Sequence, residues 1–168
     1  MDIKYNLKKG TLTITGCDPK PTGDLIIPDA IDGFPVTSIG YGAFRDCTGL
    51  TNVTIPNSVT SIGNRAFQWC SGLTNVTLPS SITSIGYGAF EGCTGLKSVT
   101  LPSSITSIRD YAFYQCRGLT SVTLPSSITS IGFAAFAICN GLTNVTLPSS
   151  ITKIGNLAFP NHTVITKT

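Results

Sequence analysis

The chain has 168 residues, of which 41% are hydrophobic and 11% are charged, and its formal net charge is +3. This length suits one domain, and the charged share is well below the usual value of roughly 25%, so Ser, Thr and Asn must supply most of the polar surface. The basic residues are scattered, and no segment approaches the roughly 18 apolar residues of a membrane span. Composition therefore argues against nucleic-acid binding and against membrane insertion.

The first 23 residues predict a cap. Apolar residues alternate over 3–7 and 12–14, on either side of a Lys-Lys-Gly turn, which is typical of a β-hairpin. A loop with proline and glycine follows from Cys17 to Gly23. We therefore expect residues 1–23 to form a capping hairpin and loop, and residues 24–168 to form an array of about six 23-residue units.

Each unit carries the pattern Ile-Gly-x-x-Ala-Phe-x-x-Cys, followed by Gly-Leu-x-x-Val-x-Leu-Pro. Ile39 and Phe44 return every 23 residues as far as Ile154 and Phe159. A fixed period of this length is the signature of a solenoid, in which each unit buries its apolar side against its neighbours.

Within one unit, the pattern predicts three short segments. Val76 and Leu78 alternate with polar residues, which predicts a strand that pairs in parallel with the same strand of the next unit. An extended segment follows and ends at Ile85. The spacing of Ala, Phe and Cys then predicts a single helical or 3₁₀ turn, with these three side chains on one face.

Five of the six cysteines occupy one column of the repeat. Stacked units would place neighbouring Cβ vectors parallel rather than facing each other, so we predict buried free thiols instead of disulfides. Cys17 lies outside this column, and its redox state is left open. The column consists of Cys47, Cys70, Cys93, Cys116 and Cys139.

The repeat resembles the bacterial leucine-rich repeat of the BspA type, also called the Treponema type, from Ile27 to Phe159. The departures are a lengthened first unit, Arg109 in place of glycine, and His162 in the cysteine column. The resemblance implies a right-handed α/β solenoid with a parallel sheet on one face and short extended and helical pieces on the other. It also implies a non-catalytic, adhesin-like module of the bacterial surface or extracellular space, with a host or neighbouring-cell surface protein as partner. A designed or consensus-built origin would give the same regularity.

The chain offers little catalytic chemistry. His162 is the single histidine, and a nucleophile pair with Cys139, one unit earlier, is the one enzymatic alternative. We interpret His162 instead as a substitution in a frayed last unit. The sequence has no phosphate loop, zinc-type cysteine pair or paired carboxylates, so we predict no enzyme activity, cofactor or metal.

The most variable positions of the repeat are the four x positions of Gly-x-x-Ala-Phe-x-x-Cys. Because the units agree elsewhere and aromatic and arginine side chains anchor protein interfaces, we predict that these positions bind a protein partner. Drift at tolerant positions, with the rings packed over neighbouring units, is the alternative. The candidate partner-binding residues are Tyr41, Arg65, Trp69, Tyr87, Tyr111, Tyr114, Phe133 and Ile138.

A second hypothesis concerns the exposed side of the predicted sheet. Its columns of Thr, Asn and Ser could form a structural scaffold or face a carbohydrate or ice, although Thr also simply suits exposed strand positions. The threonine column consists of Thr54, Thr77, Thr100, Thr123 and Thr146.

The two chain ends carry expectations of their own. Ile165 begins another strand just before the sequence stops, so we expect a truncated array or an end covered by a partner, through which the protein could oligomerise. The first residues do not match a signal peptide, so the expected extracellular location rests on the resemblance alone.

Overall fold

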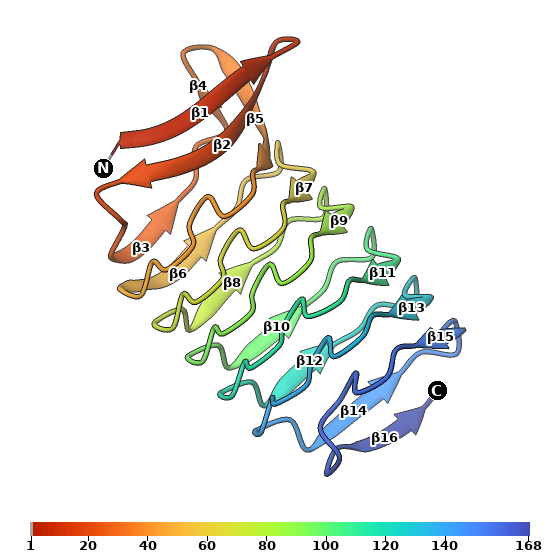
Figure 1. Cartoon of the computed structure of the whole chain (residues 1–168). Coiled ribbons are helices and arrows are strands. Elements are labelled where there is room, and N and C mark those ends of the chain that lie inside the picture. Colours follow the sequence, from red (N-terminus) through yellow and green to blue (C-terminus); the bar gives the residue numbers. More distant parts are fainter. Residues whose placement is uncertain (1) are drawn as a thin grey trace.

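The computed structural model describes residues 2–168 as a stack of coils closed at one end by a hairpin (Figure 1). The hairpin consists of β1 (Asp2–Lys8) and β2 (Thr11–Asp18), which pair antiparallel. β2 then pairs in parallel with β5 (Phe34–Ile39), and the short β4 (Ala30–Ile31) pairs antiparallel with β5. The hairpin thus lies against the first coil and extends its sheet.

Two rows of parallel strands run along the stack. The first row is β3 (Gly23–Ile26), β6 (Leu50–Thr54), β8 (Asn75–Thr77), β10 (Ser98–Thr100), β12 (Ser121–Thr123), β14 (Asn144–Leu147) and β16 (Val164–Lys167). The second row continues from β5 through β7 (Ser61–Ile62), β9 (Ser84–Ile85), β11 (Ser107–Ile108), β13 (Ser130–Ile131) and β15 (Lys153–Ile154). Val53 pairs with Val76, and Ile62 with Ile85, so equivalent residues face each other in register.

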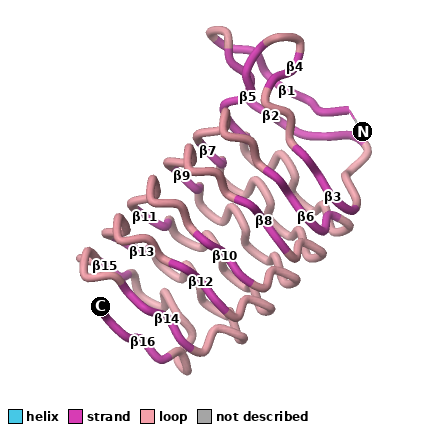
Figure 2. Tube along the Cα trace, turned by 180° about the vertical axis from the view of Figure 1, so that it is seen from behind, coloured by secondary structure: helices cyan, strands magenta, loops and turns pink. Residues whose placement is uncertain are grey.

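The third side of each coil is not helical, and here the sequence prediction was wrong. The tube in Figure 2 contains strands and loops but no helix over residues 2–168. In the turn 63–70, alternate N–H groups behave differently: Ala66 N donates to Gly63 O within its own coil, whereas Phe67 N donates to Ala89 O of the next coil at 2.8 Å. In a helical turn, successive N–H groups point the same way along one axis, so they would not alternate between their own coil and the next. The fold is therefore a β-solenoid rather than an α/β solenoid.

Left-handed backbone at two positions of each turn produces this alternation. The second and fourth variable positions have φ near +60° in nearly every coil, and most are not glycine. We call this third side the turn flank, meaning the segments Gly-x-x-Ala-Phe-x-x-Cys. The left-handed residues of the flank are Gly42, Asp46, Arg65, Trp69, Gly88, Gly92, Tyr111, Gln115, Ala134, Ile138 and Leu157.

A column of stacked phenylalanine rings forms the centre of the core. Consecutive ring centroids are 5.2–5.4 Å apart with interplanar angles of 2–11°. The cysteine column lies beside it, and all five of its members are buried, as predicted. Cys70 Sγ donates to Phe44 O of the preceding coil at 3.0 Å, and the next three cysteines repeat this bond. The thiol is therefore a second donor to a carbonyl that also accepts from the backbone within its own coil, as Phe44 O does from Cys47 N at 3.3 Å.

Both rows of strands are interrupted between coils 73–95 and 96–118, a place that we call the seam. In the described residues, β8 does not pair with β10, and β9 does not pair with β11. The glycine that opens each turn normally donates to the coil before, as Gly86 N does to Ile62 O and Gly132 N to Ile108 O, both at 2.8 Å, but Arg109 N makes no such bond. A Cβ at Gly132 would lie 2.5 Å from Asp110 N, so a side chain at this position does not fit between closely stacked coils. Arg109 therefore accounts for the open second row at the seam.

Arg109→Gly should restore this pairing and raise the free energy of unfolding. Each position that closes again recovers one backbone hydrogen bond, and the conformational entropy of glycine offsets part of this gain. We therefore expect the free energy of unfolding to rise by about 1 kcal/mol. Urea denaturation of the wild type and the variant measures it. A loss of stability in Arg109→Gly would show that the arginine stabilises the seam rather than opens it.

The last coil leaves its outer edge uncovered. Among residues 2–168, β16 pairs only with β14. Four apolar residues of this end are exposed, namely Ile154, Leu157, Val164 and Ile165. No helix of residues 2–168 is long and apolar enough to cross a membrane.

Candidate binding surface on the turn flank

Large side chains form a continuous row along the turn flank. Arg65 Nη1 donates to Tyr41 Oη at 3.3 Å, and its guanidinium carbon lies 5.6 Å from the centroid of the Tyr87 ring. The rings of Tyr87 and Tyr111 follow at 5.3 Å, and those of Tyr111 and Phe133 at 5.4 Å. We call this set the flank row: Tyr41, Arg65, Tyr87, Tyr111, Phe133 and, at its end, Leu157.

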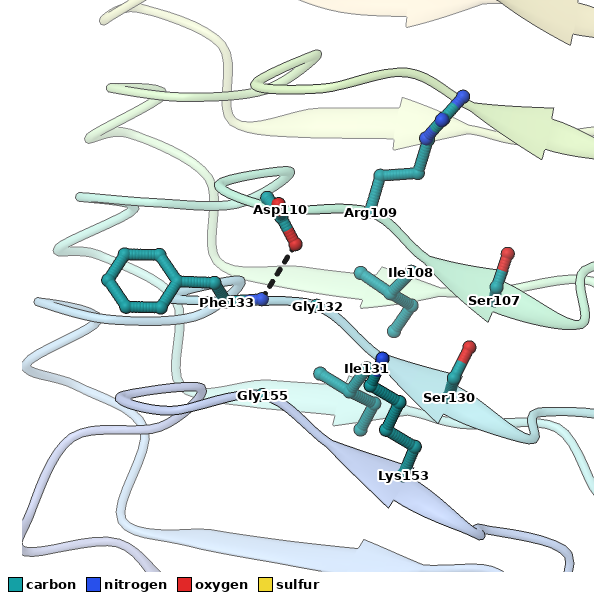
Figure 3. Close-up of a pocket in the computed structure, with 10 residues that line it drawn as sticks. All are labelled: Ser107, Ile108, Arg109, Asp110, Ser130, Ile131, Gly132, Phe133, Lys153 and Gly155. Atoms are coloured by element: carbon teal, nitrogen blue, oxygen red, sulfur yellow. Dashed lines mark hydrogen bonds between the residues drawn. The ribbon is translucent and has the colours of Figure 1, made fainter.

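The flank row follows a period of two coils. One kind of coil has a ring at the first variable position and a small residue at the second, as in Tyr87-Gly88; the other has Asn or Asp first and a large residue second, as in Asp110-Tyr111. The short polar side chain then accepts the next coil's N–H. Asp110 Oδ1 accepts from Phe133 N at 2.8 Å, and Asn64 Oδ1 accepts from Tyr87 N at 2.9 Å (Figure 3 shows the former).

The search for 23-residue columns missed this pairing. The signal was present in the sequence, because Tyr41, Tyr87 and Phe133 are each 46 residues apart. This two-coil alternation places a ring of one coil beside the large residue of the next coil, so the two side chains are in contact without overlapping. Five of the eight candidate residues are thereby brought together in one line, namely Tyr41, Arg65, Tyr87, Tyr111 and Phe133.

The flank row opens into a hollow of about 510 Å³ near the C-terminal end. Four candidate residues line it, namely Tyr111, Tyr114, Phe133 and Ile138, together with Leu157 and His162, which sequence reasoning did not include. The Tyr114 ring stands edge-on to Tyr111, with centroids 5.3 Å apart and planes at 82°. The hollow thus has rigid aromatic walls and lies on the surface.

Trp69 lies apart from this hollow. It is half-buried, and a Cβ added at Gly92 of the next coil would collide with its indole ring. The indole therefore covers the glycine and packs along the stack. Beside it, the Nε2 of buried Gln68 donates to Glu91 Oε2 of the next coil at 2.7 Å. This bond also holds the two coils together.

The Tyr111 hydroxyl of the flank row is neutral at physiological pH. The pKa of Tyr111 is raised, first by desolvation and then by its neighbours Tyr87 and Tyr114 and the charges of Asp110 and Glu91. The hydrogen bond with Tyr41 raises the pKa of Arg65. The surface therefore offers a neutral phenol as a hydrogen-bond donor at Tyr111 and a fixed positive charge at Arg65.

The enzymatic alternative finds no supporting geometry. Cys139 is buried and its Sγ donates to Phe113 O at 3.2 Å, whereas exposed His162 contacts Asn140 O through Nε2 at 3.1 Å. A nucleophilic cysteine needs a base within hydrogen-bond reach, and here each side chain is engaged with a backbone carbonyl. Within residues 2–168, no three His, Cys, Asp or Glu side chains gather into a metal-binding set.

A second hollow of about 350 Å³ lies beside the seam, where Arg109 and Lys153 depart from the glycine and serine of their columns (Figure 3). The two cationic side chains do not converge, because Arg109 extends toward the preceding coil and away from Lys153. Asp110, which also lines the hollow, is engaged with Phe133 N. This arrangement does not form an anion site.

The threonine column on the first row is exposed but not uniform. Pairing in this row is interrupted between β8 and β10 and again between β12 and β14. Hollows of about 370 and 460 Å³ lie at these two interruptions. A ligand with a strict repeat, such as ice, would require even spacing, so the interruptions weigh against that hypothesis.

A sequence comparison identifies the family to which this chain belongs. The sequence profile of the BspA type leucine rich repeat region matches residues 36–166 with six copies. The chain belongs to the BspA-type leucine-rich repeat family. No curated protein sequence matches it.

Several solved structures share the BspA-type fold. A leucine-rich repeat protein of Treponema pallidum is 31% identical, with a TM-score of 0.61, and the match covers 95% of this chain and 64% of that one. A leucine rich cell surface protein of Faecalibacterium prausnitzii is 30% identical, with a TM-score of 0.75, and the match covers 97% and 52%. The pneumococcal vaccine antigen PcpA, at 24% identity and a TM-score of 0.75, shows the fold alone, over 98% and 47%. The chain thus spans between about half and two thirds of these structures.

Proposed function

We propose that the chain is a non-catalytic protein-binding module whose partner docks on the turn flank over the aromatic hollow. The observation that carries this proposal is the concentration of Tyr111, Tyr114, Phe133 and Ile138 around one surface hollow in an otherwise repetitive stack. Large aromatic side chains that line a surface pocket are the usual anchors of protein interfaces. The rest of the flank row then forms the margin of the contact.

Rigidity supports the same conclusion. The ring of Tyr111 contacts those of Tyr87, Tyr114 and Phe133, so its conformation is fixed before a partner arrives. A preorganised anchor loses little side-chain entropy on binding, which leaves more of the contact energy as affinity. Drift at tolerant positions, with the rings packed over neighbouring units, would also give ring contacts between coils. The surface hollow that these rings line together is the observation that favours a binding role.

The family and its relatives support an extracellular setting. One solved relative is described as a cell surface protein and another as a vaccine antigen. We infer that this module acts at the bacterial surface or in the extracellular space, in an adhesin-like role toward a host or neighbouring-cell surface protein.

The test compares two double variants against a panel of displayed extracellular proteins. Tyr114→Ser combined with Phe133→Ser should weaken binding of the partner found with the wild type by about thirtyfold or more for each ring, since truncation of a hot-spot residue costs about 2 kcal/mol or more. Thr77→Ala combined with Thr100→Ala, on the exposed first row, serves as the matched control. Surface plasmon resonance gives the Kd values, and thermal melts verify folding.

An unchanged Kd in the folded aromatic variant would overturn the flank assignment. A loss of binding in the threonine control instead would move the site to the first row, and binding of glycans by that row would favour the carbohydrate scaffold.

Self-association through the exposed last coil stays a prediction. Val164 and Ile165 are exposed on the free edge strand β16, and replacing both with lysine should shift any dimer to monomer. Sedimentation velocity measures this. A wild type that is monomeric at high concentration would remove this end as a self-association site.

A further inference from the structure

The loop after β2 lies directly over the first turn of the flank. Lys20 Nζ donates to Asp46 O at 3.1 Å, and Gly23 N donates to Gly49 O at 2.8 Å. Within β2, just before this loop, a Cβ added at Gly16 would lie 4.0 Å from the carbonyl oxygen of Ala43. These contacts hold the segment that contains Cys17 against the segment that contains Cys47.

Cys47 has a different neighbour from the later members of its column. Cys70, Cys93, Cys116 and Cys139 each donate to a phenylalanine carbonyl of the coil before, at 3.0–3.2 Å. Cys47 has no such carbonyl bond, because the cap loop replaces a preceding coil. Cys17 lies there instead, beside Cys47.

The two thiols differ in acidity and in access. Burial, and then the neighbouring Cys47, raise the pKa of Cys17 to about 11. The pKa of Cys47 is lowered in spite of its burial. The neighbouring Cys70 thiol is the largest cause, followed by Cys17 and the charge of Lys20. Cys17 is half-buried and therefore reachable, whereas Cys47 is the more acidic thiol, and disulfide exchange proceeds through the thiolate.

We propose that Cys17 and Cys47 form a reversible disulfide that joins strand β2 of the cap to the first coil. The two thiols lose two protons and two electrons as the S–S bond forms. A small-molecule disulfide of the glutathione type accepts them and leaves as two free thiols, and an excess of small thiols reverses the reaction.

The column itself is a poorer place for such a bond. Neighbouring column cysteines come from coils in parallel register, so their Cβ vectors run side by side, and Cys70 is already bonded to Phe44 O. Cys17 approaches from strand β2 of the cap, outside this register. Cross-linking there would hold the cap on the solenoid and would close a long loop of chain, which stabilises the folded state.

The experiment equilibrates the full chain with glutathione buffers of increasing disulfide content. After alkylation, mass spectrometry of the digested protein should show one disulfide, between the peptides that contain Cys17 and Cys47. The melting temperature should rise by about 5–10 °C in the oxidised form and return on reduction.

Two serine variants complete the test. Cys17→Ser, at a half-buried position, should abolish both the cross-link and the shift, whereas Cys139→Ser, a column residue at the far end, should keep both. Mapping of the bond to Cys47 and Cys70 would overturn the proposal. So would full alkylation of Cys17 in the folded wild type under the most oxidising buffer.

Discussion

Replacing Phe90 with alanine should lower the free energy of unfolding by about 3–5 kcal/mol. The Phe90 ring is fully buried in the middle of the stacked column, with its centroid 5.3 Å from those of both Phe67 and Phe113. Its removal would leave a cavity that the neighbouring coils cannot close, because backbone bonds on the flank fix their spacing. Urea denaturation followed by circular dichroism measures the loss.

Phe34→Ala is the matched control for Phe90→Ala. Phe34 belongs to β5 but is exposed, so its truncation should cost less than about 1 kcal/mol. Equal costs for the two variants would contradict the conclusion that the ring column holds the solenoid together. In a repeat protein the loss can also appear as separate unfolding of the two halves, which a second transition would reveal.

The second large effect concerns the glycine that opens each turn. Gly86→Ala should destabilise the protein by about 2–3 kcal/mol, because the new Cβ would lie 2.5 Å from Asn64 N and 2.6 Å from Gly63 C. These neighbours are backbone atoms and cannot rotate away. We expect the variant to open the second row between its coils, as Arg109 opens it at the seam.

Gly16→Ala provides the control for this substitution. The nearest atom to its added Cβ would be Ala43 O at 4.0 Å, which is ordinary contact, so the change should stay within about 0.5 kcal/mol of the wild type. Hydrogen exchange of the amides around Gly86 measures the local opening. Unchanged protection there in Gly86→Ala would show that the stack can absorb a side chain at this position.

Some features of the fold follow from the sequence pattern, and others do not. The strands around Val76 and Ile85, the buried cysteine column and the stacked phenylalanines follow directly from 23-residue spacing. The turn flank did not, since Ala, Phe and Cys at i, i+1 and i+4 suit a helical turn equally well. The choice was made by hydrogen bonds to the next coil, which a single unit lacks.

The candidate site divides in the same way. Variability among coils pointed to eight residues, and four of them line one hollow, namely Tyr111, Tyr114, Phe133 and Ile138. Their connection through Tyr87 into a row depends on the two-coil alternation, and Leu157 joined the site only through contacts in space. The packing of half-buried Trp69 over Gly92 likewise could not be predicted from the 23-residue spacing.

The sequence by itself determined the repeat, the parallel register and the membership of the core, because one buried stripe per unit can be satisfied only by stacking. The tertiary structure decided the non-helical flank, the seam at Arg109 and the meeting of Cys17 with Cys47. Each of these depends on how closely one coil approaches the next. That distance is set by backbone atoms of two different units and is not encoded in the pattern of either one.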